Sequence, residues 1–98
     1  MNVGGLELEA HPATPEIQTL VNQIKSEFEA KVGTCTTKFE AIEYKQQVVA
    51  GINYFIKVLI DNGCIHLKIF VPLPYENKKP SLTSYQTDKA RHDEICYF

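Results

Sequence analysis

The chain has 98 residues, the size of one domain, and 44% of them are hydrophobic, which suffices for a core without cross-links. Its net charge is −2 and its ten Lys and Arg residues are scattered, which argues against a nucleic-acid or membrane-surface footprint. Cys35, Cys64 and Cys96 are odd in number and widely spaced, which is a poor disulfide framework and favours a reducing, cytoplasmic location.

Residues 1 to about 13 show no hydrophobic period, and Gly4-Gly5 makes the start of the chain pliable. They have neither the basic nor the apolar region of a secretory signal, and no uncharged apolar run in the chain reaches membrane-spanning length. We expect one domain over residues 1–98, with residues 1–10 as a flexible N-terminal trunk. The alternative is that residues 4–10 pair at the edge of a sheet.

A helix is predicted to begin at Thr14-Pro15-Glu16. Thr14 can cap free N–H groups, Pro15 suits the first helical position, and Glu16 favours the positive end of the helix dipole. Gly33 is placed to end the helix. Apolar residues recur between these limits at the spacing of one helical face: Ile17, Leu20, Val21, Ile24, Phe28 and Val32.

Four strands are predicted to follow. Residues 39–49 form the first, with a bulge at Ala41-Ile42, and residues 52–60 alternate cleanly between two faces. Asn62-Gly63 is a strong hairpin signal before the strand over residues 64–71, which Pro72-Leu73-Pro74 ends. A last strand is expected near residues 82–87. These elements predict an α+β fold, with one long helix packed across a four- to five-stranded antiparallel meander sheet.

The first hairpin turn is unusual because it is uncharged and apolar, reading Gln47-Val48-Val49-Ala50-Gly51. Turn tips normally carry Asn, Asp, Gly or Ser, so an apolar tip indicates a segment that enters another surface. The alternative is that these are buried strand residues. In a meander alternate turns fall at one end, so this tip and Leu73-Pro74 should form one apolar ridge.

Catalysis is disfavoured by the sequence. Cys64 and His66 would share a strand face, but no orienting carboxylate is evident, and no catalytic constellation emerges elsewhere. The Cys and His residues also lack the spacing of a metal site, and glycine-rich phosphate loops are absent. We therefore expect no enzyme activity, no metal and no cofactor.

The chain resembles the stefins, the type 1 branch of the cystatin superfamily. The resemblance covers essentially the whole chain and depends on Gly4 in the N-terminal trunk, on the pentapeptide at residues 47–51, and on Leu73-Pro74. Residues 12–17 also resemble the family's entry into its helix.

The resemblance implies a reversible, tight-binding, non-covalent inhibitor of papain-like cysteine proteases, the cathepsins. An N-terminal arm and two hairpin loops would enter the active-site cleft. The implied protease-binding residues are Val3, Gly4, Gly5, Gln47, Val48, Val49, Ala50, Gly51, Leu73 and Pro74.

The resemblance implies a cytoplasmic monomer without nucleic-acid or membrane partners. Domain-swapped or disulfide-linked dimers are alternatives, because three free cysteines exceed what a stefin is expected to carry. A second function stays open at this point, namely an interaction or structural protein of the cystatin fold that does not inhibit.

Overall fold

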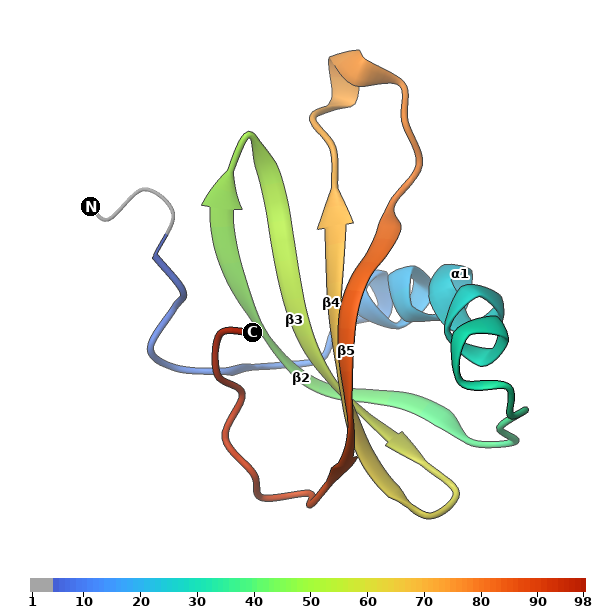
Figure 1. Cartoon of the computed structure of the whole chain (residues 1–98). Helices are drawn as coiled ribbons and strands as arrows, with labels where there is room; N and C mark the ends of the chain where they lie inside the picture. The colour runs from blue at the N-terminus through green and yellow to red at the C-terminus, as the bar shows by residue number, and fades with distance from the viewer. Residues whose placement is uncertain (1–4) are drawn as a thin grey trace.

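The computed structural model describes residues 5–98 and contains one helix against one antiparallel sheet (Figure 1). Helix α1 spans Pro15–Val32. The sheet has five strands in the order β1-β2-β3-β4-β5. Their bounds are His11–Pro12, Phe39–Val49, Gly51–Ile60, Gly63–Val71 and Ser81–Lys89, and a short 3-10 helix, η1, covers Pro74–Glu76. The predicted α+β fold with a meander sheet is confirmed.

Helix α1 begins and ends at the residues that the sequence indicates. The Thr14 hydroxyl accepts a hydrogen bond from the N–H of Ile17 at 3.2 Å, and Pro15 occupies the first turn. Gly33 adopts φ 74°, and its N–H donates to the carbonyl of Glu29. Because both ends are capped, the helix holds a fixed length across the sheet.

The core lies between α1 and one face of the sheet. The helix contributes its predicted apolar stripe, in which Val21 is fully buried and Phe28 is 2% exposed. Alternate residues of β3 and β4 complete this core, among them Ile56, Val58, Ile65, Leu67 and Ile69. The alternation of side chains along a strand therefore assigns the faces of β3 and β4 as predicted.

Strand pairing departs from a regular meander at several places, including two register shifts between β4 and β5. The register between β2 and β3 shifts between Ala41 and Glu43, where the sequence predicts a bulge. The fifth strand is β1, at His11–Pro12, rather than residues 4–10. Leu6 does form an isolated bridge with Gln47, so the edge pairing expected for the N-terminal segment is present in part.

The opposite face of the sheet is covered by the C-terminal tail, residues 90–98. Within the tail, Ile95 is 1% exposed, and Phe98 packs edge-on against Phe55 at a centroid distance of 5.4 Å. The carbonyls of Arg91 and Phe98 accept hydrogen bonds from Lys57 and Lys68. The tail thereby gives the sheet a second packed layer, which buries Phe55 completely.

Candidate functional site

The tip of the β2–β3 hairpin projects its small apolar residues into solvent. In this loop, which we call the first loop (residues 47–51), Val48 is 46% exposed and Val49 is 36% exposed. Ala50 is also exposed. Val49 pairs with Gly51, so the chain reverses tightly between them. Exposed valines at a turn lower solubility without stabilising the fold, which favours a role in contact with another molecule.

Gln47 and Gly51 lie at the base of the same loop and are buried. Gln47 is 8% exposed, and its side-chain oxygen accepts a hydrogen bond from Asn53 Nδ2 at 3.0 Å. Gly51 has φ 130°, a conformation that L side chains rarely adopt. In the free chain these two residues therefore shape the loop, while Val48, Val49 and Ala50 form its accessible surface.

Leu73 and Pro74, which we call the second loop, follow β4 and begin η1. The N–H of Leu73 donates to the carboxylate of Glu76 at 3.1 Å, and the N–H of Glu76 donates to the carbonyl of Leu73 at 3.0 Å. Pro74 is exposed and Leu73 is half-buried. This pair of hydrogen bonds closes the turn before any partner arrives.

The two loops lie side by side at one end of the sheet. Ile52, directly after the first loop, pairs with Val71, two residues before Leu73. Figure 1 shows the β2–β3 tip and the β4–β5 connection at the same end, while the turn at Asn62 and Gly63 lies at the other. The sequence-based prediction that the two apolar tips share one end agrees with this register.

The N-terminal segment reaches the same end along the edge of β2. Gly5 is exposed, and the next residue, Leu6, pairs with Gln47 at the base of the first loop. The predicted contact residues Val3 and Gly4 lie outside the described residues.

Sequence reasoning missed Tyr75, which is 80% exposed and directly follows the second loop. Its signal was an aromatic residue inside an otherwise polar stretch. The side chain lies in η1, so the second loop presents Pro74 and Tyr75 together. Large exposed aromatic residues are common anchors in protein interfaces.

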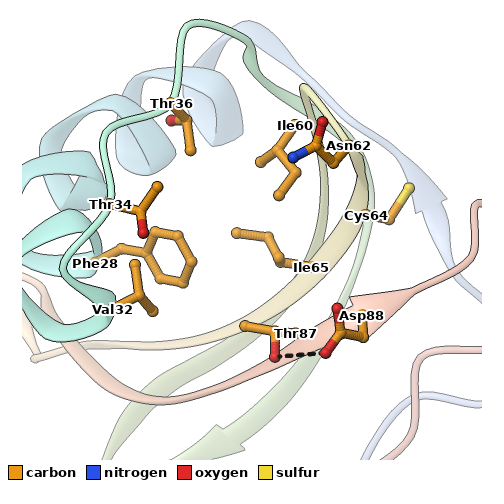
Figure 2. A pocket seen from close by; sticks show the side chains of 10 residues that line it. All are labelled: Phe28, Val32, Thr34, Thr36, Ile60, Asn62, Cys64, Ile65, Thr87 and Asp88. Atoms are coloured by element: carbon orange, nitrogen blue, oxygen red, sulfur yellow. Dashed lines mark hydrogen bonds between the residues drawn. The ribbon is translucent and has the colours of Figure 1, made fainter.

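A hollow of the molecule lies away from these loops. A cavity of about 210 Å³ opens between the end of α1 and the turn from β3 to β4, as Figure 2 shows. Phe28, Val32, Ile60 and Ile65 line it with apolar surface, and Thr and Asn side chains border it. None of the loop residues named above lines this cavity. The candidate site is therefore a projection from the molecule and not a hollow in it.

Within residues 5–98 no group of three or more His, Cys, Asp or Glu side chains could hold a metal ion. No helix there is long and apolar enough to span a bilayer.

His66 is fully buried, and neither ring nitrogen has a hydrogen-bond partner among the described residues. Desolvation, together with the positive charges of Lys57 and Lys89, lowers the pKa of His66 to about 4. A neutral imidazole inside the sheet cannot reach a bound molecule. Cys64, on the same strand, is 2% exposed.

The structure is a capped helix across an antiparallel meander sheet. One end of this sheet carries two apolar loops and the N-terminal segment, which defines a class of protein that contacts its partner through a projecting edge. Comparison with known proteins identifies the family. The family model of the cystatin domain matches residues 5–92. The chain belongs to the cystatin family, and within it to the stefins, as the sequence indicates.

Similar proteins span nearly the whole chain. Cystatin-A of Felis catus is 54% identical over 96 residues, which cover 97% of this chain and 97% of that protein. Cystatin-A1 of Sus scrofa is 52% identical over 99 residues, which cover 100% of this chain and 95% of that protein. Cystatin-B of Mus musculus is 51% identical over 88 residues, with 89% and 90% covered. The similarity therefore includes both loops and the helix.

Proposed function

We propose that the chain is a cytoplasmic, reversible, tight-binding and non-covalent inhibitor of papain-like cysteine proteases, the cathepsins among them. One observation carries the proposal: two small apolar loops lie side by side at the end of a rigid sheet, where Val48 and Val49 are exposed. The cleft of an endopeptidase accepts extended, largely apolar chain. A narrow apolar edge is complementary to such a cleft.

Preorganisation supports tight binding by this edge. The hydrogen bond between Asn53 and Gln47 holds the base of the first loop, and Glu76 holds Leu73 in the second. Because the loops are fixed before association, little conformational entropy is lost when they bind. More of the free energy of burying apolar area then appears as affinity, because the cost of ordering the loops is small.

Inhibition without cleavage follows from how such an edge would enter the protease. The two loops would fill the primed side of the cleft, and Val3 and Gly4 would lie along the non-primed side. The chain would then turn away from the catalytic cysteine at Gly4 and Gly5. No peptide bond would reach the attack geometry that the nucleophile requires, so binding would not lead to turnover.

Gln47 and Gly51 contribute to this proposal as supports for Val48, Val49 and Ala50, since both are buried in the free chain. We propose no catalytic activity for the chain itself, which would act stoichiometrically as a monomer. No cofactor enters the mechanism. Nucleic acid and membrane are not among the proposed partners.

The deciding experiment is a titration of active papain with the full chain and with a chain that lacks residues 1–5. We expect one equivalent of the full chain to abolish peptidase activity, and dilution to restore it. The truncated chain should still inhibit, but more weakly, because both loops remain. A folded chain that leaves papain fully active would instead favour a non-inhibitory interaction or structural protein of the cystatin fold.

A further inference from the structure

The N-terminal segment attaches to the edge of β2 with an irregular register. Leu6 pairs with Gln47, and His11 pairs with Tyr44. Residues 7–10 therefore lie opposite residues 45 and 46, so the N-terminal segment carries two extra residues there. The two extra residues must bulge out of the sheet edge, so the chain on either side of the bulge needs contacts that hold it to β2.

Glu7 bridges this irregular stretch with three contacts. Its N–H donates to the carbonyl of Gln46 at 3.2 Å, and its Oε1 accepts from the N–H of Gln46 at 2.8 Å. Its Oε2 accepts from His11 Nε2 at 2.9 Å. Glu7 thus engages both main-chain polar groups of Gln46 that face away from β3.

His11, the partner of Glu7, is itself held in place by contacts with β2. Its ring lies against Tyr44 at a centroid distance of 5.5 Å, and its main chain pairs with the same residue. The carboxylate of Glu7 therefore joins two points of β2, Gln46 directly and Tyr44 through His11. The intervening residues can bulge without releasing the segment on their N-terminal side.

We propose that Glu7 is a positioning residue that directs the N-terminal arm toward the first loop. Leu6 meets Gln47 because Glu7, its neighbour, is fastened to Gln46. Leu6 is consequently held opposite Gln47, at the base of the first loop. This inference rests on the proposed function, since it concerns how the arm and the first loop act as one edge.

Most exposed ion pairs contribute little, and the contact between Glu7 and His11 alone would be such a pair. The bond to the main-chain N–H of Gln46 differs from it, because a carboxylate that accepts from a peptide group in a part-buried site forms a charge-assisted hydrogen bond. The loss of this bond frees the arm, and the cost then appears in protease binding.

The test is a double-mutant cycle between Glu7→Ala and deletion of residues 1–4, with the inhibition constant for papain as the readout. The described residues 5–98 contain every helix and strand named above, and urea unfolding would establish that each form is folded. We expect Glu7→Ala to weaken inhibition about fivefold to tenfold in the full chain. In the shortened chain the same substitution should change inhibition less than about twofold.

Two further variants separate positioning from charge. Glu9→Ala removes the same charge from an exposed residue two positions away and should leave inhibition unchanged. Glu7→Gln keeps an oxygen that can accept from Gln46, and it should restore inhibition to within about twofold of the parent. Equal losses from Glu7→Ala in both chain lengths, or no loss in the full chain, would overturn the inference.

Amide hydrogen exchange provides a readout that needs no protease. Glu7→Ala should accelerate exchange at the Gln46 N–H, while the N–H groups that pair β3 with β4 keep their protection. Unchanged protection at Gln46 contradicts the inference whatever the kinetics show. If the parent chain itself fails to inhibit, the proposed function fails, and the exchange data still decide whether Glu7 holds the arm.

Discussion

Gly51 lies directly against the main chain of Val71. A β-carbon on Gly51 would stand 2.7 Å from the carbonyl oxygen of Val71 and 2.8 Å from Cζ of Phe70. Because Gly51 ends the first loop and Val71 precedes the second, this close approach sets the distance between the two loops. Gly51 is thus a spacing residue of the contact edge.

The first prediction is that Gly51→Ala separates the loops. The added methyl group clashes with main chain, and φ 130° is strained for alanine, so we expect a loss of about 2–3 kcal/mol in the free energy of unfolding. Papain inhibition should weaken as well. Gly33→Ala is the matched control, because Gly33 also has positive φ but has no atom within 4 Å of its β-carbon position. It should lower stability in urea and leave inhibition intact.

The second prediction concerns the second loop. Truncation of Leu73 to alanine should weaken papain binding by about 1–2 kcal/mol, the scale of a modest interface anchor. Leu73 is only half-buried in the free chain, so the unfolding transition should move much less than the affinity does. An unchanged inhibition constant would remove Leu73 from the set of contact residues.

The third prediction places a large side chain at Gly4. If the arm passes close to the catalytic cysteine at this residue, Gly4→Arg should collide with the protease and raise the inhibition constant by at least about tenfold. Stability in urea should stay that of the parent. A Gly4→Arg chain that inhibits as tightly as the parent would show that the arm takes another path.

Most of the fold on the core side could be predicted from the sequence, because local rules decide it. The cap at Thr14, the end at Gly33 and the turn at Asn62-Gly63 each depend on the residue in place. Alternation along β3 and β4 then fixes which side chains face the helix. These signals agree with one another, which is why the predicted meander is the observed one.

The opposite face of the sheet could not be predicted in the same way. Its side chains include the polar residues Lys57 and His66, yet Lys57 is 2% exposed and His66 is fully buried. They are covered by the tail, and Lys57 reaches Glu43 at 2.9 Å and the Arg91 carbonyl at 2.6 Å. Such long-range contacts leave no local period in the sequence. The available signal was Phe55, an aromatic residue between Asn53 and Lys57 on the same strand face.

The candidate site could likewise be predicted only in part from the sequence. Its two loops could be placed at one end from connectivity alone, and the exposure of Val48 and Val49 agrees with the apolar tip. The burial of Gln47 depends on its hydrogen bond with Asn53 across the hairpin. The role of Glu7 depends on a register irregularity. Neither the hydrogen bond between Gln47 and Asn53 nor the contacts of Glu7 can be predicted before the strand pairing is known.

The fourth prediction concerns oxidation. Cys35 and Cys96 are exposed, whereas Cys64 is buried, so intermolecular disulfides should form through the first two only. Under an oxidant, the parent chain should give dimers on a sizing column that a reducing agent converts to monomer. The double variant Cys35→Ser with Cys96→Ser should stay monomeric, and Cys64→Ser should dimerise like the parent. A parent that elutes as monomer under oxidant would exclude such dimers.

The last prediction is that His66 makes the fold sensitive to acid. Its pKa in the folded chain is lowered to about 4 from an ordinary value of 6.5, mainly by desolvation and then by Lys57. At a pH between these two pKa values, His66 is protonated in the unfolded chain and neutral in the folded chain. The free energy of unfolding should therefore fall as the pH drops through this window, by roughly 3 kcal/mol in total.

His66→Leu should remove this dependence, because leucine cannot be protonated and neither ring nitrogen has a hydrogen bond to lose. Urea unfolding of the two chains would show a pH slope in the parent that the variant lacks, and His92→Gln, at an exposed position, should keep the parent's slope.

Asp61 and Asp93 have lowered pKa values because they accept main-chain hydrogen bonds. They stabilise the fold above their ordinary value of 3.8 and lose that effect only at lower pH, so their contribution lies outside the His66 window. A slope that survives in His66→Leu would therefore assign the acid sensitivity to other groups.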